Sequence, residues 1–466
     1  MKRAAHAADQ PTGAHEGLVI RNAGAIVRAA TLMALLVVSV AHAAETLDCH
    51  VGIYHLNDGT LVDIAPADEG ALRWRRFGGT TGALRKTARG DWSSTQGWTD
   101  RLDGKRVSLP DCTTGDITFD GTRGHRVALH ATNTTFRSHD TTLAGRLVMP
   151  MGTNRVPVVV LLHGAERDSA LTYYFLQRML PTQGVGVFVY DKRGTGTSGG
   201  TYTQEFHLLA DDAVAAMREA RRLAGARLSR IGYQAGSQGG WVAPIAANLA
   251  PVDFVIVCFG LAVSVIEEDQ QEVEMEMHDK GHSPEDIAKA LEVARAAETV
   301  IASGFTRGFE EFDAVRAKYR DAPWYRDLHG NFTHMLLPYS EAQLRDMRDK
   351  FNWGTPFHYD PMPALRASAV PQLWILGGRD YEAPSAETIR RIRSLMADGR
   401  SFTLAYYPTA EHGMTLFETT ADGTRLSTRY APGYFAMIRD FARDGRLRGH
   451  YGDAELASPR DDVDPR

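Results

Sequence analysis

The sequence predicts an α/β fold: a mostly parallel sheet with helices on both faces, a helical insertion and a small β-rich module at its N-terminal side. Three observations lead to this prediction. From about residue 124, short apolar runs alternate with helical patterns, as in βαβ units. Between 261 and 359 this alternation gives way to a purely helical pattern. Before residue 124 the runs are shorter and separated by turn residues.

The first 43 residues have the features of a secretory signal peptide. Arg28 precedes the apolar run 31–40, and small residues at Ala41 and Ala43 stand at the cleavage spacing. The run is too short to span a bilayer comfortably, which argues against a stable membrane anchor. We therefore expect an exported protein, periplasmic or extracellular, with a mature chain that begins near Ala44. Retention of an uncleaved leader is the alternative.

The chain has three cysteines. Export permits a disulfide between Cys49 and Cys112, which would stabilise the fold by about 4 kcal/mol if it acts through chain entropy. Two free thiols are the alternative. Cys258 lies in the apolar run 252–258 and is expected to be a buried packing residue.

Residues 44–123 form the predicted β-rich module. Turn signals such as Asn57-Asp58-Gly59 and Asp120-Gly121 separate its short strands. Its tryptophans are expected to pack in the core, and stacking on a carbohydrate is the alternative for Trp74, Trp92 and Trp98.

The predicted core has two parts, 124–260 and 360–448, which flank the insertion 261–359. Its strands are mostly apolar, as in sheets buried on both faces; we expect them at 126–130, 143–149, 156–162, 185–190, 229–233, 252–258, 372–376 and 402–407. In the insertion, Ser283 and Pro284 indicate the start of a helix. The tail 449–466 is charged and contains proline, and we expect it to be disordered.

Charge and motifs exclude several classes of function. The formal net charge of -5 provides no basic field for nucleic acid. The sequence contains no H-E-x-x-H, paired C-x-x-C or acidic calcium loop, so no metal or other cofactor is predicted. Oligomeric state leaves no signal in the sequence.

Ser237 is the candidate nucleophile. It follows a β-like run and is crowded by small residues, Ala235, Gly236, Gly239 and Gly240, which permit close backbone approach. A serine hydroxyl needs a base to take its proton, and the base needs a third group to orient it.

Two residues can supply these functions. Asp380 follows the predicted strand 372–376, and His412 follows the strand 402–407. The order Ser237, Asp380, His412 is the one associated with a nucleophile elbow. Carboxyl ends of parallel strands lie at one edge of the sheet, so the three side chains can converge there.

An oxyanion hole is predicted from two backbone amides. His163-Gly164-Ala165 directly follows the strand 156–162, so that the Ala165 N–H can face a substrate carbonyl. The amide of Gln238, the residue after the nucleophile, supplies the second donor.

Five motifs in this order resemble the α/β-hydrolase superfamily: HGA at 163–165, YDKRGTGTSGG at 190–200, AGSQGGW at 235–241, GGRDYEAP at 377–384 and EHGM at 411–414. The resemblance covers about residues 124–445 and is to exported bacterial esterases and dienelactone-hydrolase-like members with a helical cap, which are related to prolyl-oligopeptidase-like peptidases. One departure is Ala235, where the elbow usually has glycine.

The resemblance implies a serine hydrolase that cleaves a small-molecule ester through an acyl-enzyme. A peptidase or thioesterase of the same fold is the alternative, and a catalytically silent binding module is the alternative from another class.

Each of these assignments has a purely structural alternative. Asp380 can instead cap a helix near Pro384, and His412 can be a surface residue. Glu411 is expected to be a solvated neighbour of His412. The pattern from Gly194 to Gly199 matches a dinucleotide fingerprint, which would have to open a helix at once; we expect Asp191 and Arg193 to brace this loop instead.

Substrate contacts are predicted from cap and loop residues. Arg167 can bind a substrate carboxylate or form an internal salt bridge. The aromatic and methionine residues can line the pocket or form the core of the cap; the candidates are Trp241, Met275, Met277, Trp324 and Tyr325, together with Met335 and Trp353.

Overall fold

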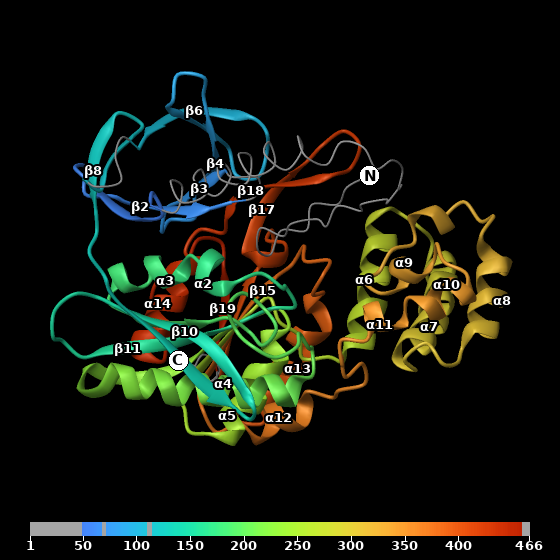
Figure 1. Ribbon diagram of the computed structural model, residues 1–466. Coiled ribbons are helices and arrows are strands. Elements are labelled where there is room, and N and C mark those ends of the chain that lie inside the picture. The colour runs from blue at the N-terminus through green and yellow to red at the C-terminus, as the bar shows by residue number, and fades with distance from the viewer. Residues whose placement is uncertain (1–48, 68–70, 110–113, 459–466) are drawn as a thin grey trace, which may run out of the picture.

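The computed structural model describes residues 49–67, 71–109 and 114–458. A barrel is followed along the chain by a nine-stranded sheet with helices on both faces, and a helical cap is inserted between two strands of that sheet (Figure 1). The predicted signal peptide lies outside the described residues, as does Cys112, so export and the disulfide stay predictions. Across the described ranges, none of the helices combines the length and apolarity needed to cross a bilayer.

Eight antiparallel strands close into the N-terminal barrel. Trp74 and Trp92 are buried in its interior, as expected, whereas Trp98 lies outside this core and packs edge-on against Tyr430, at 5.4 Å between ring centroids. Tight turns with glycine at positive φ, such as Gly59 at 82°, join the strands. The strands are β1 (Gly52–Leu56), β2 (Leu61–Pro66), β3 (Leu72–Arg75), β4 (Thr81–Lys86), β5 (Trp92–Thr95), β6 (Leu102–Ser108), β7 (Asp116–Phe119) and β8 (Thr122–Arg126).

The large sheet has the order β19-β16-β15-β14-β13-β11-β12-β10-β9. Its centre, from β12 to β16, is parallel, and antiparallel strands stand at both edges. The strands are β9 (His130–Ser138), β10 (Thr141–Met149), β11 (Val156–Leu162), β12 (Gly186–Tyr190), β13 (Leu228–Gly236), β14 (Phe254–Cys258), β15 (Gln372–Gly377), β16 (Phe402–Tyr407) and β19 (Glu455–Ala457).

Both faces of the sheet are buried, which explains the apolar runs. Along β11, Val158 and Val160 pack in one hydrophobic cluster, and Val159 and Leu161 in the other, because side chains alternate across a strand. One cluster contains residues of α4 (Phe206–Ala224), α5 (Gly239–Leu249), α12 (Met362–Ala367) and α13 (Ser385–Ala397). The other contains residues of α2 (Ala170–Tyr173), α3 (Leu176–Met179) and α14 (Tyr434–Asp444).

The expected cysteine packing is present at the end of β14. Cys258 is fully buried in the second cluster, where burial raises the pKa of its thiol to about 11. The thiol is therefore a packing group at neutral pH.

Two predictions at the ends of the core were wrong. The strand expected at 126–130 is instead β9, which begins at His130; as an edge strand with an exposed face it has no apolar run to find. The tail after 449 is ordered through β19, which pairs with β16, because Tyr451 is buried and its hydroxyl donates to Asp440 at 2.9 Å. Residues 459–466 lie outside the described part.

The cap is helical, as predicted. Ser283 caps the helix that begins at Pro284, accepting a hydrogen bond from the Asp286 amide at 3.1 Å. The cap helices are α6 (Val265–Asp279), α7 (Pro284–Ala302), α8 (Phe309–Tyr319), α9 (Thr333–Leu336), α10 (Glu341–Asp346) and α11 (Arg348–Phe351).

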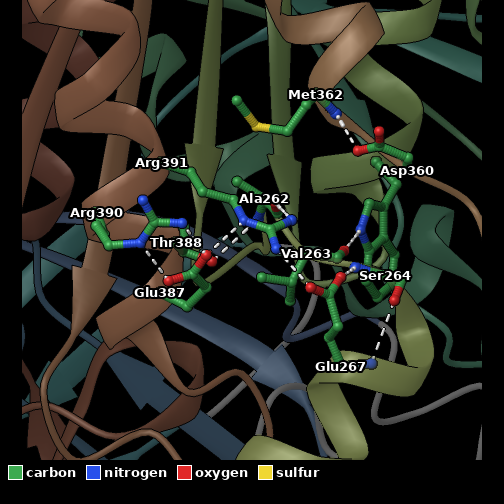
Figure 2. Close-up of polar contacts among 11 residues, drawn as sticks. Ala262, Val263, Ser264, Glu267, Asp360, Met362, Glu387, Thr388, Arg390 and Arg391 are labelled. Atoms are coloured by element: carbon green, nitrogen blue, oxygen red, sulfur yellow. Dashed lines mark hydrogen bonds and ion pairs between the residues drawn. The ribbon is translucent and has the colours of Figure 1, made fainter.

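Polar contacts fix the start of α6 to the core (Figure 2). Ser264 and Glu267 form a capping box at the first turn. From α13, Arg391 pairs with Glu267 and donates to the Ala262 carbonyl at 3.0 Å, while Thr388 Oγ1 accepts from the Ala262 amide at 3.0 Å. The direction of α6 over the sheet is therefore set by the core.

A buried ion pair joins the barrel to the core. Asp63 of β2 is fully buried and accepts two hydrogen bonds from Arg178 of α3, the one from Nη2 to Oδ2 measuring 3.1 Å. The hairpin of β17 (Thr415–Thr419) and β18 (Arg425–Tyr430) adds backbone bonds, including Trp98 N to the Ser427 carbonyl at 2.8 Å. Side-chain charge and backbone together hold the barrel in place.

We expect Arg178→Ala to lower the free energy of unfolding by about 3 kcal/mol, because it leaves the Asp63 carboxylate buried without its cation. The measurement is urea unfolding followed by tryptophan fluorescence. As the matched control, Arg222→Ala removes an exposed partner of Glu219 and should cost less than about 1 kcal/mol. Equal losses in the two variants would contradict the role of the buried pair.

Candidate active site

Ser237 occupies a sharp turn between β13 and α5. Its φ is +50°, the left-handed region that residues other than glycine rarely adopt. The turn is held by hydrogen bonds from the Ser237 amide to the Cys258 carbonyl at 3.1 Å and from the Gly240 amide to the Ser237 carbonyl at 2.7 Å. Such strain is maintained only where the surroundings fix it, and here it lifts one hydroxyl out of the sheet edge.

Gly239 explains why the turn accepts Ala235. A Cβ at Gly239 would lie 3.0 Å from the His163 carbonyl oxygen and 3.1 Å from both the Leu162 carbonyl oxygen and the Ala235 Cβ. The absent side chain at 239 thus leaves the space that the Ala235 methyl fills. The departure from glycine at position 235 is compensated across the turn.

Asp380 and His412 meet at the carboxyl ends of neighbouring strands, β15 and β16. The His412 Nδ1–H donates to the Asp380 carboxylate, at 3.0 Å to Oδ2 and 3.1 Å to Oδ1. Asp380 also accepts from the Ala383 amide at 2.8 Å. Both side chains are buried, and α13 begins without a side-chain cap from Asp380. The contact fixes the imidazole and leaves Nε2 as its other nitrogen.

Phe259 contacts both His412 and the turn that carries Ser237. A Cβ on Gly236, the neighbour of Ser237, would come within 2.9 Å of the Phe259 ring. The same ring packs edge-on against the His412 imidazole, at 4.9 Å between centroids. Gly236 and His412 therefore lie against the same aromatic side chain, and Ser237 and His412 line the same cavity.

Glu411 is a half-buried neighbour of His412 rather than the solvated one that was expected. Its carboxylate accepts hydrogen bonds from Ser427 at 2.5 Å and from Thr415 at 3.1 Å, behind the hairpin of β17 and β18. Burial is the main cause that raises the pKa of Glu411. The acid that contacts His412 is Asp380.

The cavity has a volume of about 1520 Å³ and three walls. The core contributes Ser237 and His412, the barrel contributes Arg75 and Trp98, and the cap contributes side chains of α6 and of the segment before α9. The barrel therefore forms part of the surface that a substrate would meet.

The two residues whose amides are predicted as oxyanion donors both line this cavity. Ala165 and Gln238 line it, and neither N–H donates a hydrogen bond to another residue within the described ranges. The Ala165 loop is held through its carbonyls: Lys192 Nζ donates to Gly164 O at 2.7 Å, and the Tyr202 hydroxyl to Ala165 O at 2.5 Å. The loop's position is set without using its N–H groups.

Beneath that loop lies a buried ionised group. Burial would raise the pKa of Glu166, but the hydrogen bond from His163 and the charge of Lys192 outweigh it and lower the pKa to about 2. Tyr174 also hydrogen-bonds this carboxylate. Burial lowers the pKa of Lys192 to about 8, against the opposing charge of Glu166.

Carboxylates control the charge of His412. Burial would lower the pKa of the imidazole, but Asp380, Glu382 and Glu268 outweigh it and raise the pKa to about 10. Glu382 Oε2 lies 3.7 Å from His412 Nε2, on the side away from Asp380. The neighbouring carboxylates therefore favour the protonated imidazole.

The predicted substrate contacts divide into two groups. Arg167 and Trp241 line the cavity, as do Met335 and Trp353. Arg167 forms no salt bridge within the described part of the chain; its guanidinium stacks over Tyr202 at 4.2 Å and over Trp353 at 5.1 Å.

Four predicted contacts do not line the cavity: Met275, Met277, Trp324 and Tyr325. Met277 and Trp324 are buried in the core of the cap. The reason lies in the rotation of α6, which turns a row of glutamates toward the cavity and its apolar stripe toward α7.

Sequence reasoning missed this acidic row, which consists of Glu268, Glu272 and Glu276. The three residues recur at a spacing of four, which places them on one face of a helix. All three are buried and line the cavity. The spacing is visible in the sequence, but the sequence alone does not show which face of the helix points into the cavity.

The glycine-rich loop is not a dinucleotide site. No helix opens at Gly199, since α4 begins only at Phe206. Asp191 accepts hydrogen bonds from the Thr197 amide at 2.9 Å and from Ser169 at 2.8 Å, while Arg193 pairs with Asp212. Asp191 and Arg193 brace the loop, as expected.

Residues 153–276, from β11 into α6 and including Ser237, match the sequence profile of a family described as serine aminopeptidase, S33. The chain has the α/β-hydrolase fold. The match agrees with the resemblance of the five motifs to the α/β-hydrolase superfamily, and the class it supports is that of serine hydrolases. No curated protein matches the chain significantly.

Solved structures of similar fold include hydrolases of two kinds. An esterase of Pyrococcus furiosus is 16% identical, with a TM-score of 0.39, over 61% of this chain and 84% of its own. An acylaminoacyl peptidase of Pyrococcus horikoshii is 15% identical, with a TM-score of 0.42, over 84% of this chain and 58% of its own. A hypothetical protein from Pseudomonas aeruginosa is 17% identical, with a TM-score of 0.37, over 68% of this chain and 94% of its own.

Gly239→Ala should destabilise the protein by about 1–3 kcal/mol, because the new methyl meets two carbonyl oxygens and the Ala235 methyl. Thermal unfolding measures the effect. Gly78→Ala is the control, since a Cβ there meets no atom within 4 Å. If both variants unfold like the wild type, the close packing at the turn is not as described.

Proposed function

We propose that the chain is a carboxylic ester hydrolase with Ser237 as nucleophile, His412 as general base and Asp380 as the residue that orients His412. The observation that carries the proposal is the buried hydrogen bond between His412 and Asp380 beside a cavity that Ser237 also lines. Action outside the cytoplasm is part of the proposal and rests on the leader-like residues 1–43.

The chemistry follows from these groups. The Ser237 hydroxyl attacks the ester carbonyl while His412 Nε2 takes its proton. The amides of Ala165 and Gln238 donate to the oxyanion, which collapses as His412 returns the proton to the departing alcohol. Water, activated in turn by His412, then hydrolyses the acyl-enzyme to free acid and serine.

A serine peptidase is the second candidate, and the acidic row favours it over a thioesterase. Carboxylates on the cavity wall would attract a substrate that carries a protonated amine, as a peptide does at its amino terminus. The matched family is also described as a serine aminopeptidase. Esters and amides share the same acyl-enzyme route.

A fluorophosphonate probe should label the wild type, and Ser237→Ala should abolish labelling and lower kcat on p-nitrophenyl esters by about 10⁴-fold or more. Ser93→Ala, at a half-buried barrel serine that does not line the cavity, is the control and should behave as the wild type. Turnover of p-nitroanilides of amino acids without any ester hydrolysis would establish the peptidase instead. Retained labelling in Ser237→Ala would refute the assignment of the nucleophile.

The pH profile tests the role of the neighbouring carboxylates. His412 accepts a proton only when neutral, so kcat/KM should rise as the pH increases toward the raised pKa of the imidazole. Removing an anion lowers that pKa, so Glu382→Gln should move the rise to lower pH and increase activity near neutrality. Glu310→Gln, an exposed cap substitution, should leave the profile unchanged. A rise that stays in place, or moves to higher pH, in Glu382→Gln would contradict the assignment.

A further inference from the structure

Three metal-ligating side chains converge on the cap wall of the cavity. Glu272 and Glu276 come from α6, and His329 comes from the segment between Asp327 and α9. One ligand atom from each lies within 4.8 Å of the other two. We propose that these side chains bind a divalent transition-metal ion, which goes beyond the hydrolytic function because that chemistry uses no metal.

The spacing suits a metal ion. Residues four apart stand one above the other on a helix, so both carboxylates point the same way. Ligand atoms about 2.0–2.2 Å from a metal lie roughly 3–3.5 Å from each other in a tetrahedral shell. Glutamate side chains can close the remaining gap by rotation about their own bonds, without a change in the backbone.

Charge favours a cation at this place. Glu272 and Glu276 are only 2% and 1% exposed, and like charges one turn apart on a helix repel each other. Burial of carboxylates is costly, and a bound metal is one of the ways in which proteins offset it. A dication between the two groups would relieve both effects.

Glu268 is an independent indication of the same kind. It lies one turn before Glu272 on the same face, is 8% exposed, and lines the same cavity. Its carboxyl makes no hydrogen bond with another side chain in the described ranges. A third buried carboxyl group therefore lines the cavity wall beside the two proposed ligands.

The donor set selects the class of metal. One imidazole and two carboxylates suit Zn²⁺, Mn²⁺ or Fe²⁺, whereas Ca²⁺ and Mg²⁺ prefer oxygen ligands alone. The His329 ring stacks on His334, at 4.0 Å between centroids, and the nearby Asp327 binds His282 at 3.1 Å. These contacts hold the segment that presents His329.

The site would tie α6 to the segment before α9 and keep coordination positions open to the cavity. Three protein ligands with open positions are typical of metal sites that also bind a small molecule. A donor atom of a substrate could therefore bind there, on the cap wall, while the carbonyl to be cleaved reaches Ser237. The metal would act in substrate recognition.

The test uses the full chain, freed of metal by chelation and dialysis, and titrated with Zn²⁺ or Mn²⁺ alone in a calorimeter. We expect about one equivalent to bind, with an affinity at least about tenfold weaker in Glu272→Gln/Glu276→Gln and in His329→Gln. Glu274→Gln, on the exposed face of the same helix, is the matched control and should bind as the wild type. Ser237→Ala should also bind normally, so that the metal site is tested apart from the hydrolytic function.

Thermal unfolding provides the second measurement. Bound metal should raise Tm in the wild type and in Glu274→Gln but not in the ligand variants, whose Tm without metal shows that they fold. The proposal is overturned if no metal binds, or if binding is unchanged in the ligand variants. Loss of binding in the glutamate variant alone, with His329→Gln unaffected, would indicate an acidic surface for organic cations and would also overturn it.

Discussion

The hydrogen bond between His412 and Asp380 is the contact on which the account of the site depends. It joins loops after two adjacent parallel strands, so the register of β15 and β16 determines where the imidazole lies. Phe259 links the imidazole to the turn at Ser237, because its ring packs against His412 and against Gly236. A strained serine, a buried acid and an oriented histidine are thus consequences of one sheet edge on which several loops converge.

The core side and the cap side of the cavity carry side chains of opposite charge. On the core side, Lys192 and Arg167 lie close to the loop whose amides would meet an oxyanion. On the cap side, the acidic row of α6 faces the same space. A substrate therefore meets Arg167 on the core side and acidic groups on the cap side, and the barrel closes the third side with Arg75 and Trp98. This polarity favours molecules with a cationic or metal-binding end, and it also raises the pKa of His412.

The sequence predicts best those features that depend on residues close together in the chain. Apolar runs such as 156–162 predict a sheet covered on both sides, and the order of Ser237, Asp380 and His412 predicts their convergence. Edge strands were harder to predict, because β9 alternates between exposed and more buried residues and carries no apolar run. The role of α6 was misjudged because methionines and glutamates alternate around it; only the packing against α7 decides which set faces the cavity. Closure of the barrel and the position of Trp98 depend on contacts between residues far apart in sequence, such as Trp98 and Tyr430.

The most direct measurement concerns the proton between His412 and Asp380. In a proton NMR spectrum, a histidine Nδ1–H held by a buried carboxylate gives a separate, strongly downfield resonance. The account predicts that this resonance is present in the wild type and in Ser237→Ala, and that it disappears in Asp380→Ala and in His412→Ala. A resonance that persists in Asp380→Ala, or its absence from the folded wild-type protein, would contradict the arrangement from which the proposed chemistry is derived.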